Sequence, residues 1–398
     1  MTLQLVPPPP PPWPDPIGQT PLRSWRRSAS GRSGTDPWLT GAALALALVG
    51  AVLIYSATRS GQAGGSSSRA YLYRHLANVA LAVGLGGLAA RADSLRLRLL
   101  GPTLYGAGIL GLIAVALFGA TINGAHAWLQ LPGGLQVQPA EFAKLGVIVG
   151  LAVWFADRTV NRALDGPPTA LDVGVALAGC AVPLALIMTQ PDLGSAMVVA
   201  VAAFGVLLAA GVRARWLIGL MVLAVLIAVL SVRAGLLADY QLARFTSFTD
   251  PGRDVQGVAY NVHQARIAVA NGGLLGRGLF AGPQTAGGYV PEQQTDFVFS
   301  AAGEQFGFLG SLVLVLLFAL LLWRALRIAA SAEVSGRLVA VGVVCWFAAQ
   351  VFENIGMNVG LTPVTGLPLP FVSYGGSSMF AAAVAVGLLQ AAGRATVR

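Results

Sequence analysis

Long uninterrupted apolar runs constrain this chain more than any other feature. A helix needs about 20 mostly apolar residues to cross the roughly 30 Å hydrocarbon core of a bilayer. Several runs reach that length, and only 10% of the 398 residues are charged, against about 25% in soluble domains. We therefore predict an all-α, polytopic membrane protein with about ten transmembrane helices. They lie near residues 37–57, 71–90, 97–119, 140–157, 169–188, 192–211, 214–234, 297–323, 338–360 and 371–393.

Arginine is unevenly distributed between the segments that join these helices. With the N-terminus inside, the inner segments carry sixteen arginines, whereas the short outer loops carry only Arg59, Arg69 and Arg74. Positive charge collects on the cytoplasmic side of membrane proteins. We therefore place both termini in the cytoplasm and one large loop, about residues 235–296, outside the cell membrane. The formal net charge of +9 then reflects topology, and no nucleic-acid partner is expected.

The first 35 residues differ from the rest of the chain. Residues 7–12 are six consecutive prolines, and four arginines follow before the first apolar run. A segment this rich in Pro, Ser and Gly cannot bury enough apolar surface to fold. We predict a disordered, Pro-rich cytoplasmic tail over residues 1–35 and a single transmembrane domain over residues 36–398.

The large outer loop has two contrasting parts. Apolar residues recur at helical spacing in residues 256–271, which predicts an amphipathic helix lying on the outer surface. Residues 272–288 follow with seven glycines and must be flexible or tightly turned. Their stretch GGLLGRG superficially resembles a phosphate-binding loop. It follows no strand and lacks the P-loop lysine, which argues against nucleotide binding.

Asp296 is the most informative acid, because it stands where this polar loop meets the eighth apolar run. One interpretation is a structural cap, since Thr295 and Asp296 are good residues for a helix N-terminus. The other is catalytic: a carboxylate in a semi-dry groove has its pKa raised toward the range that suits a general base. Both roles are compatible.

Three further acids and the single lysine of the chain lie in or beside apolar runs. Glu141 and Lys144 are three residues apart, which predicts an ion pair or a polar path for a substrate headgroup. Asp192, between Pro191 and Gly194, fits a turn or cap. Glu304 lies two turns beyond Asp296, where an acid faces the bundle interior and is paired or bound to water.

The stretch of residues 362–378, TPVTGLPLPFVSYGGSS, is irregular at membrane depth. Such backbone is tolerated only where protein or water covers its polar groups, so we expect it, with Ser377, to line a cavity. Among the outer-loop arginines, Arg244 and Arg277 offer forked donors that suit phosphate oxygens. A polar stripe on the ninth run, with Asn354 and Asn358, is interpreted as packing between helices.

Several of these blocks together resemble one family, the bacterial SEDS proteins (shape, elongation, division and sporulation) of the RodA and FtsW group. The matching blocks occur in order over about residues 37–395. They are NGAHAW, QPAEFAKL, QPDLGS, the DPGRD to QARIAVANGGLLGRGL loop, PEQQTDFVFSAAGEQFG and NVGLTPVTGLPLPFVSYGGSS. The blocks PEQQTDF and PLPFVSYGGSS look more like RodA than FtsW.

This resemblance implies a peptidoglycan glycosyltransferase that polymerises lipid II into glycan strands at the outer face of the bacterial cytoplasmic membrane. It places the family's essential acid on Asp296 and its loop tryptophan on Trp128. Other motif positions fall on Glu141, Lys144, Asp192 and Glu304. It also implies a partner, a class B penicillin-binding protein that acts as transpeptidase.

The chain departs from the family pattern at two places. His126 and Ala127 precede Trp128, where a basic residue is usual, and Gln294 stands where histidine is common. A positive charge beside Trp128 and proton transfer through residue 294 are therefore not expected.

The resemblance and the acid together suggest an inverting displacement, with Asp296 taking a proton from the acceptor sugar. The diphosphate leaving group needs charge neutralisation more than protonation. That charge would come from outer-loop arginines, from Lys144 or from a bound divalent cation, Mg²⁺ or Mn²⁺. The alternative function is a lipid II flippase, because carriers also show interrupted helices and polar groups in the membrane.

Overall fold

Ten long helices follow the predicted apolar runs. The structure is a computed structural model, and it describes residues 35–59, 66–122, 125–131, 135–161, 167–235, 244 and 257–394. The predicted tail therefore lies outside the described residues, apart from residue 35. The long helices are α2 (Pro37–Arg59), α3 (Ser66–Ala89), α4 (Ser94–Phe118), α5 (Pro139–Asn161), α6 (Ala170–Thr189), α7 (Leu193–Ala209), α8 (Ala214–Arg233), α12 (Val298–Ser331), α13 (Val334–Val359) and α14 (Gly376–Arg394).

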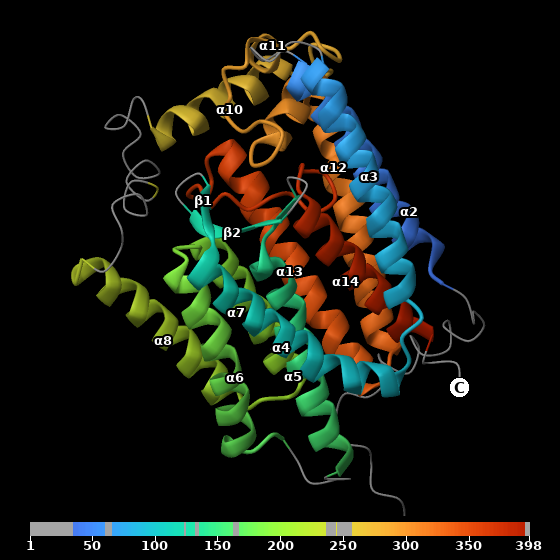
Figure 1. Cartoon of the computed structure of the whole chain (residues 1–398), viewed down its shortest axis with the longest axis vertical. Coiled ribbons are helices and arrows are strands. Elements are labelled where there is room, and N and C mark those ends of the chain that lie inside the picture. Colours follow the sequence, from blue (N-terminus) through green and yellow to red (C-terminus); the bar gives the residue numbers. More distant parts are fainter. Residues whose placement is uncertain are drawn as a thin grey trace, which may run out of the picture.

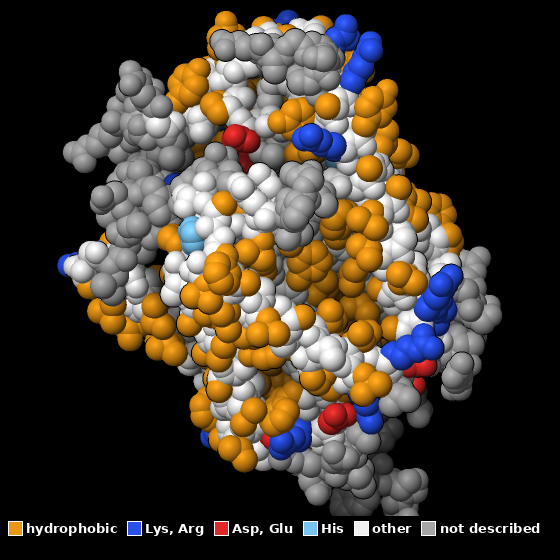
Figure 2. Space-filling view, viewed as in Figure 1, with side chains coloured by type: hydrophobic (Ala, Val, Ile, Leu, Met, Phe, Trp, Pro, Cys, Tyr) orange, Lys and Arg blue, Asp and Glu red, His pale blue; other side chains and the backbone are white. Residues whose placement is uncertain are grey.

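Eight of the helices in the described ranges are long and apolar enough to cross a membrane. Helix α7 is also apolar but has only 17 residues. Helix α3 falls short because Arg74, His75 and Asn78 interrupt its apolar sequence. The prediction of an all-α, polytopic membrane protein is confirmed, and Figure 2 shows apolar side chains spread over much of one face of the bundle.

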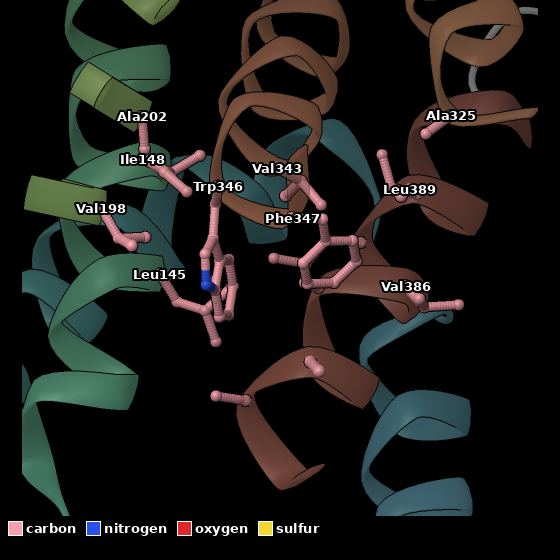
Figure 3. Packing of buried hydrophobic residues seen from close by; sticks show 14 of the residues in the cluster. Leu145, Ile148, Val198, Ala202, Ala325, Val343, Trp346, Phe347, Val386 and Leu389 are labelled. Atoms are coloured by element: carbon pink, nitrogen blue, oxygen red, sulfur yellow. The ribbon is translucent and has the colours of Figure 1, made fainter. Parts of the chain in front are cut away.

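Helix α13 forms the centre of the packed core. Its Trp346 lies toward Leu145 of α5 and Val198 of α7, while Phe347 lies on the side of Val386 of α14 (Figure 3). These side chains are buried. Because lipid tails are as apolar as these residues, close packing rather than water exclusion has to hold the helices together.

A small sheet interrupts the all-α pattern directly after the C-terminal end of α4. Strands β1 (Ala120–Ile122), β2 (Ala125–Leu131) and β3 (Leu135–Val137) pair antiparallel in the order β1-β2-β3. In this register Ala120 pairs with Trp128 and Leu129 with Val137. The strands are too short for an alternating pattern to stand out in the sequence, which is why they were not predicted.

Two short helices lie in the part of the outer loop that the structure describes. The helix predicted at residues 256–271 is confirmed by α10 (Val258–Gly272), which packs on α12 and α13, and α11 (Pro283–Gly287) lies within the glycine-rich stretch. Figure 1 places both at one end of the bundle, beside the start of α12. They therefore cover the place where Asp296 enters the bundle.

Three helices meet at Asp36. Its carboxylate accepts hydrogen bonds from the backbone N–H of Trp38 and Leu39 and so caps α2. The same carboxylate pairs with the Arg324 guanidinium of α12. Its main chain exchanges hydrogen bonds with the side chain of Gln390 in α14. This cluster joins α2, α12 and α14 at the end of the bundle opposite to Asp296.

Close contact between α3 and α14 depends on glycine. A Cβ on Gly86 would lie 2.8 Å from the Ala383 carbonyl oxygen, and one on Gly387 would lie 2.3 Å from the Gly86 carbonyl oxygen. Gly87, one residue further along α3, has open space around it. Gly86 therefore packs tightly against α14, whereas its neighbour Gly87 in the same helix does not.

We expect Gly86→Ala to lower the thermal unfolding midpoint in detergent, because overpacking costs about 1–3 kcal/mol. Gly87→Ala is the matched control and should leave the midpoint unchanged or raise it, since alanine favours a helix by about 1 kcal/mol over glycine. Differential scanning fluorimetry measures both. Equal midpoints for the two variants would contradict this packing.

Candidate functional site

Asp296 lies in a tight turn immediately before α12. The backbone N–H groups of Thr295, Asp296 and Phe297 all donate to the carbonyl oxygen of Glu292. Glu292 itself has a positive φ of 50°. The Asp296 side chain is partly buried, so it stands at the boundary between the outer loop and the membrane-spanning helix.

Three successive main-chain carbonyls of this turn are held by the C-terminal part of the chain. The Gln294 carbonyl accepts from the Tyr374 N–H at 2.9 Å, and the Thr295 carbonyl accepts from the Ser373 hydroxyl at 2.5 Å. The Asp296 carbonyl accepts from two side-chain amides of α13, as described next. The backbone that carries the carboxylate is therefore fixed independently of the carboxylate itself.

Asn354 and Asn358 of α13 bind the Asp296 carbonyl oxygen at 2.9 and 3.1 Å. The Oδ1 atom of Asn358 also accepts from the Ser300 N–H of α12 at 2.9 Å. Both asparagines are fully buried, where an unpaired amide would cost free energy. Their spacing of four residues puts them on one face of α13, facing the turn.

The capping role expected for Asp296 is wrong. The N-cap residue of α12 is Phe297, which makes no side-chain cap. The amide of Asn358 supplies that hydrogen bond from a different helix. Because Asp296 is not engaged in capping, its carboxylate remains available for chemistry.

Gly366 and Arg244 lie beside this carboxylate. A Cβ on Gly366, whose φ is +74°, would stand 3.3 Å from Asp296 Oδ2 and 3.9 Å from an Arg244 guanidinium nitrogen. The Arg244 guanidinium also donates to the Thr365 carbonyl at 3.1 Å. Residues 365 and 366 therefore lie next to both the Asp296 carboxylate and the Arg244 guanidinium.

The pKa of Asp296 is raised to about 6, mainly by burial and to a smaller extent by the negative charge of nearby Glu292. The positive charge of Arg244 and a hydrogen bond from Thr295 oppose this shift. An acid with this pKa is ionised for the most part at neutral pH yet can hold a proton.

The predicted ion pair between Glu141 and Lys144 is confirmed, with Lys144 Nζ 2.6 Å from Glu141 Oε1 and both side chains buried. Lys144 Nζ also donates to Gln350 Oε1 at 3.2 Å, and Gln350 Nε2 donates to the Pro368 carbonyl. Asn354 binds the neighbouring Leu367 carbonyl. The buried pair thus supports the same irregular segment that lies against Asp296.

The side chains of Asp192 and Ser377 both form hydrogen bonds with Gln138. Asp192 caps α7 through the Ser195 N–H, which confirms the predicted cap, and its other oxygen accepts from Gln138 Nε2 at 3.1 Å. The Ser377 hydroxyl accepts from the Gln138 N–H at 3.0 Å. Gln138 immediately precedes α5, so these hydrogen bonds join the N-terminal ends of α5, α7 and α14.

The side chains of Glu304 and Arg277 both bind main-chain groups of the outer loop. The Glu304 carboxylate accepts from the N–H groups of Gln284 and Thr285 and from the Thr285 hydroxyl, which confirms a paired acid facing the interior. The Arg277 side chain is exposed and donates to the Asn271 carbonyl at 2.7 Å. Both residues therefore organise the glycine-rich part of the outer loop.

Trp128 is partly buried in strand β2, which contacts the outer ends of α4 and α5. Its strand therefore lies over the end of α5 that carries Glu141.

Several residues of the site were not predicted from the sequence as site residues. Glu292, Gln350 and Gly366 lie in ordinary-looking polar or turn sequence. One signal was available: the polar stripe with Asn354 and Asn358, interpreted above as packing between helices, extends on the same face of α13 to Gln350, four residues before Asn354. Within the described ranges, no group of three or more His, Cys, Asp or Glu residues comes together to hold a metal.

Comparisons with known proteins show which family the chain resembles. The family model FTSW_RODA_SPOVE, described as "Cell cycle protein", matches residues 37–397. The chain is 39% identical to the peptidoglycan glycosyltransferase MrdB of Escherichia coli (strain K12) over 289 residues, which are 72% of this chain and 76% of that protein.

Two solved structures are also similar. One is a chain described under the structural coordination of polymerization and crosslinking by a peptidoglycan synthase complex, with a TM-score of 0.75 and 32% identity over 90% of this chain and 98% of that chain. The other is the rod shape determining protein RodA of Thermus thermophilus. It has a TM-score of 0.65 and 30% identity over 90% of this chain and 97% of that chain.

We expect Asn358→Ala to lower the free energy of unfolding by about 1–3 kcal/mol, because it removes a donor to the Asp296 carbonyl and the acceptor for the Ser300 N–H. Asn271→Ala is the control, since its side chain takes no part in these bonds. Thermal unfolding of the purified protein in detergent compares them. The interpretation is contradicted if both variants unfold at the wild-type temperature.

Proposed function

The chain belongs to the FtsW, RodA and SpoVE family of cell cycle proteins, and from this premise we propose that Asp296 is its general base. The protein is a peptidoglycan glycosyltransferase of the SEDS type. One observation carries the assignment of the base: a partly buried carboxylate, whose pKa is raised to about 6, stands just before α12 on a backbone fixed by α13 and by the turn that precedes α14.

The proposed reaction is an inverting displacement between two lipid-linked saccharides. Asp296 accepts the proton of the N-acetylglucosamine 4-hydroxyl on lipid II. The resulting oxygen nucleophile bonds to the anomeric carbon of the growing glycan chain, and the bond from that carbon to the undecaprenyl diphosphate breaks. One base suffices, because a diphosphate leaves with its electron pair once its charge is neutralised.

Among the described residues, Arg244 is placed to neutralise the negative charge of the departing diphosphate. Its guanidinium lies beside Asp296 across Gly366, and arginine binds phosphate oxygens with two parallel donors. We propose that Arg244 binds a substrate diphosphate. Arg277 and Trp128 are proposed substrate contacts of the outer loop and of the β2 strand.

The buried acids and the lysine support the substrate indirectly. Glu141 and Lys144 are enclosed by protein, so we propose that they position residues 367–368 rather than touch a sugar. Asp192, Ser377 and Glu304 are proposed to shape the outer ends of α7, α14 and α11 around the substrate.

A divalent cation is a further proposal. Asp296 and Glu292 supply two carboxylates, and hard cations such as Mg²⁺ or Mn²⁺ prefer such oxygens together with substrate phosphates. When bound, the cation would neutralise the departing diphosphate.

The protein is a multi-pass membrane protein. We propose that it resides in the bacterial cytoplasmic membrane with both termini inside and Asp296 outside. A class B penicillin-binding protein is the proposed partner, supported by the similarity to a chain of a synthase complex that polymerises and crosslinks. The names of the relatives favour a glycosyltransferase over the flippase considered earlier.

We expect Asp296→Asn to abolish glycan chain formation by purified protein supplied with labelled lipid II in detergent, where there is no membrane to cross. Asp157→Asn is the control, because that exposed acid pairs with Arg98 at the inner side. Parallel reactions with a chelator, and with the transpeptidase added, test the cation and the partner. Full activity of Asp296→Asn would remove the residue from the role of base.

We expect activity to rise with pH through about 6, since the base must be deprotonated. Arg244→Gln removes the charge that lowers the pKa of Asp296, so the midpoint should move to higher pH. Glu292→Gln removes a charge that raises that pKa, so the midpoint should move to lower pH. Arg337→Gln, at the inner end of α13, serves as control.

Rates of glycan formation between pH 4.5 and 8.5, on the order of one point per half unit, resolve these shifts. Midpoints that move in the same direction for Arg244→Gln and Glu292→Gln would contradict the electrostatic account.

A further inference from the structure

Helix α12 is interrupted about two and a half turns from its start. Gly307 has φ 66° and ψ −163°, far from helical values. A break of this kind removes intrahelical hydrogen bonds, and unpaired backbone groups are costly in a bilayer. The partners of the freed groups therefore decide whether the break can lie at membrane depth.

The glycine-rich loop of residues 273–278 supplies those partners. The N–H groups of Arg277 and Gly278 donate to the carbonyls of Glu304 and Gln305 at 2.9 and 3.1 Å. In the other direction, the N–H groups of residues 308 and 309 donate to the carbonyls of residues 273 and 274 at 2.8 and 3.1 Å. Loop and helix thus satisfy each other's backbone.

Glycine makes this approach possible. A Cβ on Gly272 would lie 1.9 Å from the Gly303 carbonyl oxygen, and one on Gly276 would lie 2.1 Å from the Gln305 carbonyl oxygen. The two close contacts are four residues apart on the loop and two residues apart on α12. The loop is therefore held at a fixed height along α12.

The side chains on the outside of this junction are large and apolar. Leu274 is 62% exposed and Leu275 is 75% exposed. Phe308 and Leu309 beside them, and Val313 further along α12, are exposed as well. The apolar surface of the loop is therefore continuous with the exposed apolar face of a membrane-spanning helix.

The length of α12 gives the depth of the junction. Trp323 is half exposed, with the guanidinium groups of Arg324 and Arg327 over its ring, as is typical of a membrane interface. A core of about 30 Å corresponds to roughly 20 helical residues. Counting back from Trp323 puts the outer boundary near residue 303, so Phe308 lies about 8 Å inside it.

Helix α2 gives the same depth independently. It runs from exposed Trp38 at the inner side to Arg59 at the outer side. The Ser56 hydroxyl donates to Gln305 Oε1 at 2.7 Å, which sets the two helices in register. The ring of Phe280, at the end of the loop, packs on Tyr55 at 5.9 Å. Tyr55 and Ser56 precede Arg59 by about one helical turn, and the Arg59 guanidinium lies over the same Phe280 ring at 5.0 Å, so both contacts lie near the outer boundary.

We propose that residues 273–280 dip into the outer leaflet of the membrane, with the side chains of Leu274 and Leu275 among the lipid acyl chains. The only charged side chain of the stretch, Arg277, donates to the carbonyl of Asn271, next to Gly272 and therefore at the level of residue 303. Its charge thus stays at the boundary, while the two leucines stand below it.

The consequence is a fixed height for the rest of the outer loop. Residues 284 and 285 of α11 follow the dip and bind the Glu304 carboxylate. Gln293 then joins α11 to α2 through the carbonyls of Thr285 and Ala57. A loop anchored in lipid would hold the turn that carries Asp296 at a set distance from the membrane surface.

Site-directed spin labelling tests this placement without relying on activity. The full chain, with Cys180→Ala and Cys345→Ala, is labelled at Leu275→Cys or, as a second position, Leu274→Cys, and placed in nanodiscs of phosphatidylethanolamine and phosphatidylglycerol. Val313→Cys is the lipid reference and Glu292→Cys the aqueous reference. Collisions are measured with oxygen, which partitions into lipid, and with a water-soluble nickel chelate.

We expect the labels at 274 and 275 to match the label at 313, with oxygen accessibility exceeding that to the nickel chelate several-fold. Accessibility to the chelate like that at 292 would place the loop in water and overturn the proposal. Low accessibility to both reagents would mean that protein, not lipid, covers the leucines, and would overturn it equally.

Discussion

The geometry of the site depends on how the main chain before α12 is held. Each of the carbonyls of residues 294, 295 and 296 accepts a hydrogen bond from the segment after α12, either from α13 or from the turn that precedes α14. Within the turn, the Thr295 hydroxyl adds a hydrogen bond to the Glu292 carbonyl at 3.2 Å. The Asp296 carboxylate is therefore free to face Gly366 and Arg244, and its raised pKa follows from that partly buried position.

The bilayer explains why so much irregular backbone surrounds this turn. Residues 362–375 are not helical, yet their carbonyls at 365, 367 and 368 are bound by Arg244, Asn354 and Gln350. The break in α12 is satisfied in the same way by the glycine-rich loop. In both places non-helical backbone is covered by protein groups, which is the condition for its presence at membrane depth.

The sequence allowed the long helices to be predicted closely, because apolar runs and arginine positions respond to the bilayer directly. The Glu141–Lys144 ion pair and the Asp192 cap could also be predicted, because the residues that form each of them are close in the chain. The amide that caps α12 was missed, because Asn358 comes from another helix and residue spacing within α12 carries no trace of it. The β-sheet that contains Trp128 was missed because its strands run for only three to seven residues.

The central claim is that the Asp296 carboxylate accepts the proton of the attacking sugar hydroxyl. A structure of the Asp296→Asn protein with lipid II bound as acceptor tests it most directly, since the amide keeps the shape of the acid but halts the reaction. The account predicts the N-acetylglucosamine 4-hydroxyl oxygen within about 2.6–3.2 Å of the residue 296 side chain. A 4-hydroxyl bound to a different acid or base, with residue 296 out of reach of the sugar, would contradict it.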